Sequence, residues 1–177
     1  MISYVIDFDN DVSIVQLTST DSIDKEFECK NSKYTEYYKV HAFNDMEKGI
    51  GQTWLCIYKD KVVGFISVAM AHMRPERHEK LEGKGYGNIP ALLIGHLATH
   101  KEYERKGIGT NLIAWTIKEA VNSSARIGCR IVMLNPENDP KIKEYYVNRG
   151  FTYVSHDDKE KDAFYLDIQR KRKPITN

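Results

Sequence analysis

The feature that most constrains the fold is an almost continuous apolar segment that leads into a glycine-bearing turn and then into a helical pattern. The segment is 89–99, and the turn carries Arg105, Lys106, Gly107 and Gly109. An apolar run of this length is expected for a central strand that is buried on both faces. The apolar residues after Gly109 recur on one helical face. The pattern therefore predicts a strand, a glycine turn and a helix in direct succession.

A helix that begins directly after glycines is suited to hold an anion. Its first-turn N–H groups lack intrahelical partners, and its dipole places partial positive charge there. Glycine lets the backbone approach a ligand closely, and Arg105 and Lys106 add charge at the rim. Phosphate or pyrophosphate is the matching ligand. An ordinary strand-to-helix connection has the same appearance, so this motif does not decide between the two interpretations.

The other patterns place short strands and helices around this unit. Strands are expected near 12–17, 53–58, 62–70, 129–134, 151–155 and 163–169, and further helices near 31–48 and 138–150. The Lys59–Lys61 segment predicts a hairpin turn between the second and third strands. Asn138 or Asp139 is the expected cap of the last helix, with Pro140 in its first turn. The order predicts an α+β fold with a central β-α-β unit.

Composition indicates a single globular domain, 1–177, with a basic C-terminal tail at 170–177. The 25 acidic and 26 basic residues nearly cancel, so no overall charge favours nucleic acid or a membrane surface. Three widely spaced cysteines predict neither a disulfide framework nor a metal clip, and no metal site is expected. The N-terminus resembles no signal peptide, and no segment is apolar enough to span a membrane. A cytoplasmic location is the expectation.

Two motifs, taken together, resemble the GCN5-related N-acetyltransferase (GNAT) superfamily. The acetyl-CoA signature of that family is Gln/Arg-x-x-Gly-x-Gly/Ala, which falls here on 104–109. Its later Tyr-x-x-x-Gly-Phe motif falls on 146–151. The resemblance covers 12–169 and implies a mixed sheet of six or seven strands, helices on both faces and a central acetyl-CoA unit. Glu104 departs from the signature, since the family has Gln or Arg at that position.

The resemblance implies an acetyl-CoA-dependent N-acetyltransferase that acts on a primary amine. Its thioester-binding strand end maps to Leu97–Thr99, and main-chain N–H groups there would meet the thioester oxygen. Tyr146 is the expected general acid and Tyr145 the expected core residue. The spacing from Asn138 favours Tyr145 as the acid instead, so this choice stays open. The residues assigned to acetyl-CoA are Leu97, Ala98, Thr99, Arg105, Lys106, Gly107, Ile108, Gly109, Thr110 and Asn138.

No base is evident from the sequence. His96 lies on the same predicted strand as the thioester site, and an imidazole titrates near neutral pH. His96 is therefore the candidate base, with a packed structural histidine as the alternative. His72, His78 and His100 are expected in surface loops.

Further stretches resemble the toxin branch of the superfamily, whose members acetylate the amino acid on charged transfer RNA. They are Phe27-Glu28-Cys29 and the segment 90–98, where His96 replaces the usual arginine. The acceptor is thus a small-molecule amine, a protein amine or charged transfer RNA. RNA binding would need local cations, and the candidates are Arg74, Arg77, Lys80, Lys84 and the C-terminal run. A homodimer, an antitoxin for the toxin branch, and an inactive CoA-binding or partner-binding module also stay open.

Overall fold

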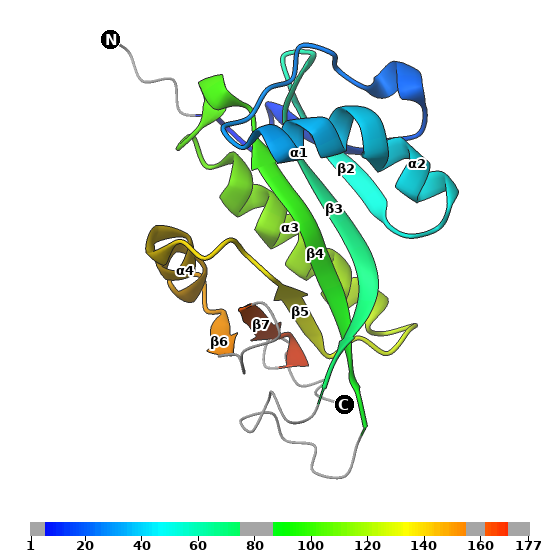
Figure 1. Ribbon diagram of the computed structural model, residues 1–177, viewed down its shortest axis with the longest axis vertical. Helices are drawn as coiled ribbons and strands as arrows, with labels where there is room; N and C mark the ends of the chain where they lie inside the picture. The colour runs from blue at the N-terminus through cyan, green and yellow to red at the C-terminus, as the bar shows by residue number, and fades with distance from the viewer. Residues whose placement is uncertain (1–5, 75–86, 155–161, 170–177) are drawn as a thin grey trace. The chain divides into compact units, whose positions relative to one another are not determined.

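The computed structural model describes residues 6–74, 87–154 and 162–169 (Figure 1). These residues divide into two compact units. The first unit holds the described residues up to 69 together with 95–115. The second holds 70–74, 87–94 and the described residues from 116 onward. Three long elements run through both units: β3 (Lys61–Met73), β4 (Ile89–Thr99) and α3 (Ile108–Ser123).

The described part of the chain contains one mixed seven-stranded sheet, in the order β1-β2-β3-β4-β5-β7-β6. The other strands are β1 (Val12–Gln16), β2 (Gln52–Tyr58), β5 (Ile131–Leu134), β6 (Thr152–Val154) and β7 (Ala163–Asp167). β4 and β5 are parallel, with Ala91 opposite Ile131, and α3 connects them. The predicted α+β class and central β-α-β unit are therefore confirmed.

β4 has the bounds that the apolar run predicts and stands in the middle of the strand order. Its burial is not continuous, however. Ala91, Ile94 and Ala98 are buried, whereas Pro90 and Gly95 are exposed. The prediction of a strand buried on both faces is wrong, because apolar composition does not reveal which positions of a face a helix covers.

A single helical stretch covers one face of the sheet in the first unit. It comprises α1 (Ser32–Glu36), a π-helical turn η2 (Tyr37–His41) and α2 (Ala42–Glu47), with a 3-10 turn η1 (Thr20–Ser22) upstream. Figure 1 shows α1 and α2 lying across β2 and β3. Tyr38 and Ala42 pack there against Leu55 and Phe65. The expected helix is confirmed, but the π turn has no counterpart in the prediction.

The end of α2 and the turn between β2 and β3 have the backbone conformations that the sequence predicts. Gly49 adopts φ +68° at the end of α2, as a left-handed C-terminal residue. Lys59 and Asp60 both adopt positive φ, at 49° and 60°, between β2 and β3. Two left-handed residues in succession match the right-handed twist of a tight hairpin. The hairpin predicted between these strands is therefore confirmed.

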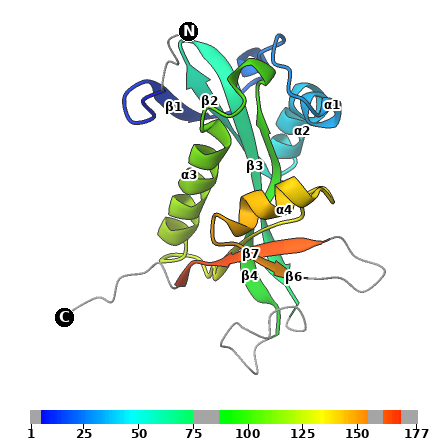
Figure 2. The same cartoon turned by 90° about the vertical axis from the view of Figure 1, so that its left-hand side faces the viewer.

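The second unit has its own apolar cluster. Met73 and Ile89 pack there with Ile131, Met133 and Tyr165. Figure 2 shows α4 (Pro140–Val147) beside β6 and β7. The helix begins after Asp139 and is followed by Gly150 at φ +85°.

Candidate functional site

The turn that leads into α3 has the backbone of an anion cradle. After β4, a 3-10 turn η4 (Lys101–Tyr103) is capped by His100, whose Nδ1 accepts a hydrogen bond from the Glu102 N–H at 3.2 Å. Arg105 adopts φ +59° and Gly107 φ +88°. A left-handed arginine is uncommon, and the +88° position favours glycine. These two left-handed residues lead the chain into the first turn of α3.

Two cationic side chains lie beside this turn, where the sequence predicts a pyrophosphate site. Arg105 and Lys106 are exposed, and the Nζ atom of Lys106 lies 4.7 Å above the Tyr103 ring. Ile108 is buried and anchors the first turn, whereas Thr110 is exposed. The orphan N–H groups of a helix start and two nearby cations are the donors that a diphosphate requires. Glu104, which departs from the family signature, is exposed.

Two glycines allow close packing around the cradle. A Cβ atom on Gly107 would lie 3.2 Å from the ring of Phe8. A Cβ atom on Gly64 of β3 would lie 2.7 Å from Cγ2 of Ile108 and 3.0 Å from the Ala98 carbonyl oxygen. Gly64 therefore allows the end of β4 and the start of α3 to approach the same point of β3.

The strand end before the turn is partly accessible. Ala98 is buried in the core of the first unit, while Leu97 and Thr99 are half-buried. The His100 N–H donates to the Val63 carbonyl at 2.9 Å, which ties the strand end to β3. The same unit thus contains both Leu97–Thr99 and the cradle at 105–110. Thioester binding by the N–H groups of these strand residues stays a prediction.

His96 is held by three neighbours in the first unit. Ser67 Oγ lies 3.0 Å from His96 Nδ1 and also accepts the His96 backbone N–H at 2.9 Å. The Tyr37 ring stacks on the imidazole with centroids 3.5 Å apart and planes 15° apart. The Tyr34 ring meets it edge-on at 5.7 Å. These contacts hold the His96 ring from several sides, and its role as a base stays a prediction.

The environment of His96 favours its neutral form. Burial lowers the pKa of His96 below its ordinary 6.5, and the nearby Asp45 carboxylate partly opposes this shift. Burial also raises the pKa of Tyr37, while the Ser67 and Thr53 hydroxyls lower it and Asp45 raises it. A neutral imidazole at physiological pH can accept a proton, so the base hypothesis is chemically sound.

In the second unit, Tyr146 and Tyr145 differ in burial. Tyr146 is 8% exposed and packs against Phe151 and Phe164, with ring centroids 5.7 and 5.9 Å away. Tyr145 is half-buried under the Arg149 guanidinium, 3.4 Å from its ring centroid. Tyr145 was the expected core residue, and that expectation is wrong. The cause is the start of α4, which sets which helical face meets β7. Tyr146 as general acid stays a prediction.

The cap of α4 is settled by hydrogen bonding. The Asp139 carboxylate accepts the Lys141 N–H at 2.8 Å, so Asp139 is the N-cap. Asn138 is exposed just before it. Asn138 is thus not used as the cap, and its predicted contact with pantetheine stays a prediction.

Several expected residues lie elsewhere. His72 is exposed within β3, and His100 is a half-buried cap, so neither is a surface loop residue. Arg74 is exposed. The remaining basic candidates, and His78, lie outside the described residues: Arg77, Lys80, Lys84 and the C-terminal run.

Sequence reasoning did not identify Ser67, Asp45 or the role of Tyr37. Tyr37 is visible in the helical periodicity, but its pairing with His96 depends on a helix and a strand far apart in sequence. Ser67 carries no signal, because a serine in a strand pattern is ordinary. The unusual helical turn that presents Tyr37 is likewise not encoded by any motif.

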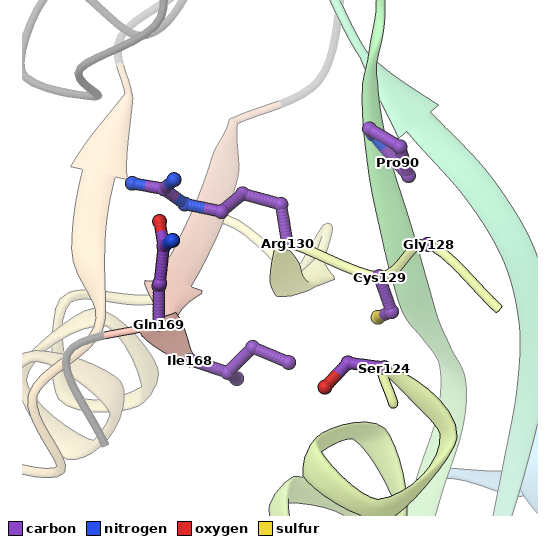
Figure 3. A pocket seen from close by; sticks show the side chains of 7 residues that line it. All are labelled: Pro90, Ser124, Gly128, Cys129, Arg130, Ile168 and Gln169. Carbon is purple, nitrogen blue, oxygen red and sulfur yellow. The ribbon is translucent and has the colours of Figure 1, made fainter. Parts of the chain in front are cut away.

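A shallow pocket of about 210 Å³ lies in the second unit (Figure 3). The Cys129 thiol and the Ser124 hydroxyl belong to its wall, and burial raises the pKa of Cys129. The Arg130 guanidinium is paired with both Asp167 carboxylate oxygens at 3.0 Å. No predicted site residue lines this pocket, whose walls are formed by Pro90, Ser124, Gly128, Cys129, Arg130, Ile168 and Gln169.

Two other kinds of site are not found in the described ranges. No three His, Cys, Asp or Glu side chains are grouped as a metal site would require within 6–74, 87–154 and 162–169. In the same part of the chain, no helix has the length and apolarity to cross a bilayer.

Comparison with known proteins assigns the chain to a family. The acetyltransferase (GNAT) family model matches residues 17–151. A tRNA-acetylating toxin of Mycobacterium tuberculosis (strain ATCC 25618 / H37Rv) is 22% identical over 120 residues, which are 66% of this chain and 70% of that protein.

Solved structures share the fold over almost the whole chain. AtaT complexed with acetyl-methionyl-tRNAfMet matches with a TM-score of 0.79 and 18% identity, covering 91% of this chain and 97% of AtaT. AtaTR bound with acetyl-CoA matches with a TM-score of 0.76 and 19% identity, covering 91% and 96%. With the cradle and the family match, these findings show that the chain belongs to the GNAT family and is an N-acetyltransferase that uses acetyl-CoA.

Proposed function

We propose that this chain acetylates the α-amino group of the amino acid carried on charged transfer RNA, and so inhibits translation in the cytoplasm. The observation that carries the proposal is the match, over nearly the full length of both chains, to AtaT with acetyl-methionyl-tRNAfMet. The mycobacterial tRNA-acetylating toxin supports the same acceptor. The half-buried His96 beside Leu97–Thr99 supplies a base suited to an amine.

The residues have complementary roles in the proposed reaction. Acetyl-CoA supplies an acetyl group already activated as a thioester. Main-chain N–H groups of the α3 start, with Arg105 and Lys106, hold the diphosphate. N–H groups at 97–99 stabilise negative charge on the acetyl oxygen. Asn138 contacts the pantetheine arm.

Two proton transfers accompany the transfer of the acetyl group to the amine. His96 Nε2 accepts a proton from the amine, whose nitrogen bonds to the acetyl carbon as the carbon–sulfur bond breaks. Tyr146 donates its hydroxyl proton to the departing sulfur. The products are an amide and a free thiol, and His96 then returns its proton to solvent while Tyr146 regains one.

Two classes of partner follow from the proposal. Basic residues Arg74, Arg77, Lys80 and Lys84 would contact transfer RNA phosphates, which makes binding salt-dependent. AtaT has been solved with the C-terminus of the antitoxin AtaR, which supports an antitoxin as the protein partner of this chain.

The decisive test incubates the purified protein with isotope-labelled acetyl-CoA and a charged transfer RNA pool. Mass spectrometry should find labelled N-acetyl-aminoacyl adenosine after nuclease digestion. Uncharged transfer RNA, free amino acids, polyamines and a lysine-rich protein are the matched acceptors. Label on one of these, with none on charged transfer RNA, would refute the proposed acceptor while leaving the acetyltransferase assignment intact.

A further inference from the structure

Segment 27–29, which has the sequence Phe27-Glu28-Cys29, pairs with the chain where β4 ends, within the first unit. Cys29 and His100 form an isolated antiparallel bridge. The Lys101 N–H donates to the Glu28 carbonyl at 2.8 Å. The segment therefore adds one bridge to the sheet directly after β4.

β3 occupies one edge of the last part of β4. The His96 N–H donates to Ser67 Oγ at 2.9 Å. The His100 N–H donates to the Val63 carbonyl at 2.9 Å. Both acceptors belong to β3, and successive N–H groups of a strand point to opposite edges. The N–H groups at positions 97, 99 and 101 therefore point to the other edge.

This other edge holds both segment 27–29 and the predicted thioester donors. The Lys101 N–H meets Glu28 there. The N–H groups of Leu97 and Thr99 point the same way by the alternation along the strand. Within the described ranges, the pairing of β4 with β5 ends at Ile94, before these residues. Segment 27–29 is thus placed to hold the strand end that β5 does not reach.

Phe27 anchors the segment in the core of the first unit. Its side chain is fully buried. Its ring meets the rings of Tyr38 and Phe65 edge-on, with centroids 4.9 and 5.6 Å away. It also meets the His100 ring edge-on at 5.6 Å, on the residue that forms the bridge. The bridge therefore has a rigid support on the side of the core.

Cys29 ties the other end of the segment to the start of α1. Its N–H donates to Thr35 Oγ1 at 3.1 Å, and its thiol donates to the Asn31 carbonyl at 3.0 Å. The Asn31 side chain accepts the Lys33 N–H at 3.0 Å and so caps the helix. The segment is consequently fixed by the core and by α1 before it meets β4.

We propose that segment 27–29 is a positioning segment for acetyl transfer. Its bridge holds the free edge at the end of β4, so that the N–H groups of Leu97 and Thr99 are already directed at the thioester when acetyl-CoA binds. Donors that are oriented in advance stabilise developing charge without reorganisation. The inference rests on the proposed function for the role of these N–H groups, and it does not depend on which amine is the acceptor.

Lys101→Pro is the direct test, because proline lacks the N–H that bonds to Glu28. Lys101 is the first residue of η4, a position that proline tolerates at a helix start. His100 has φ −57° and ψ 137°, which is the conformation favoured before proline. Lys101→Ala is the matched control, since it keeps the N–H and loses the ion pair with Glu28. That pair is more than half exposed and contributes little.

Lys101→Pro should raise the Kd for acetyl-CoA by about tenfold and lower kcat by about tenfold or more. Lys101→Ala should stay within about twofold of wild type in both. Inhibition by ADP, which has the diphosphate but no pantetheine arm, should be nearly unchanged in both variants. Calorimetry gives the Kd without an acceptor, and kcat is measured with whichever acceptor takes up the label. Thermal melting confirms that each variant is folded.

Amide hydrogen exchange tests the bridge in the wild-type protein. The Lys101 amide should exchange slowly without ligand, whereas acetyl-CoA should be needed to slow the amides of Leu97 and Thr99. Thr35→Val removes the acceptor of the Cys29 N–H and leaves Lys101 unchanged. This variant should speed exchange at Lys101 and weaken acetyl-CoA binding more than ADP binding. It also decides the matter if Lys101→Pro does not fold.

The outcomes separate this proposal from the proposed function. Equal Kd and kcat in Lys101→Pro and Lys101→Ala, or fast exchange at Lys101 in wild type, would overturn the positioning segment. An equal loss of ADP and acetyl-CoA affinity would overturn it as well, because the bridge would then support the diphosphate turn. If the variants behave as expected with another amine but charged transfer RNA is not acetylated, the positioning segment stands and the transfer RNA proposal fails.

Discussion

The phenol ring of Tyr37 lies almost parallel to the imidazole of His96, with centroids 3.5 Å apart and planes inclined by 15°. This stack joins the helical π turn to the central strand β4. It holds the imidazole one residue before the strand end that is predicted to bind the thioester. A packed histidine and a catalytic histidine would both need such support, and pH dependence distinguishes them.

The acid limb of the pH–rate profile should have its midpoint below 6.5. The base must be neutral, and burial lowers the pKa of His96 below that ordinary value. Activity should therefore persist as pH falls to 6.5 and decline only below it. Asp45→Asn should move this limb to lower pH, because the Asp45 charge raises the pKa of His96. His96→Gln should abolish the limb and lower kcat by about a hundredfold. Thiol release measured across pH checks this, and an unaltered limb in His96→Gln would exclude His96 as the base.

Gly107→Ala should weaken acetyl-CoA binding by about tenfold or more, because alanine at φ +88° costs on the order of 1–2 kcal/mol and its Cβ meets the Phe8 ring. Gly49→Ala is the matched control. It adds a similar strain at φ +68° with no atom within 4 Å, at the end of α2. Calorimetric titration with acetyl-CoA should show a weaker Kd for Gly107→Ala alone. Equal affinities of the two variants for acetyl-CoA would show that the diphosphate does not bind at the Gly107 turn.

Gly64→Ala should destabilise the protein by about 1–3 kcal/mol, as expected for overpacking. Its Cβ would lie 2.7 Å from Ile108 and 3.0 Å from the Ala98 carbonyl oxygen, which is backbone and cannot yield easily. Gly128→Ala places its Cβ in open space and serves as the control. Urea unfolding gives the free energy of unfolding of each. A Gly64→Ala variant as stable as Gly128→Ala would mean that β4 and α3 can move apart without penalty.

Tyr146→Phe should lower kcat by about a hundredfold or more and leave acetyl-CoA affinity nearly unchanged, because only the donated proton is lost. Tyr145→Phe should turn over within about threefold of wild type. Steady-state thiol release with a fixed amine measures both. The reverse order of effects would assign the acid role to Tyr145.

Glu104→Gln should lower the KM for acetyl-CoA by about two- to fivefold, since it removes an exposed carboxylate beside the predicted diphosphate site. Glu102→Gln is the control, as another exposed carboxylate in η4. The difference should shrink at high salt, because exposed charges are screened. Kinetics at two ionic strengths checks this. A rise in KM for Glu104→Gln would show that the carboxylate takes part in binding.

Local signals in the sequence were sufficient for most elements and for the glycine turn before α3. The bounds of β4, the hairpin at Lys59–Asp60 and the left-handed Gly107 follow from short-range rules on apolar runs, turns and glycine. The family resemblance rests on the same kind of signal, since its two motifs are short and each lies on one turn. Interactions between neighbouring residues are enough to encode such features.

Longer-range features were not predictable in this way. The choice of Tyr146 over Tyr145 as the buried ring depends on how α4 meets Phe151 and Phe164. The selection of Asp139 rather than Asn138 as cap depends on which carboxylate or amide reaches the Lys141 N–H. Both pairs are adjacent in sequence and similar in propensity, so only packing separates them.

By itself, then, the sequence determined the order of strands and helices, the glycine turn before α3 and the family, because each is encoded by residues within one or two turns of each other. The tertiary structure alone decided the surroundings of His96. Tyr37 and Ser67 come from a helix and a strand that are separated along the chain, and they meet the imidazole only when the sheet has formed. Burial lowers the pKa of His96, and burial acts through space rather than along the chain.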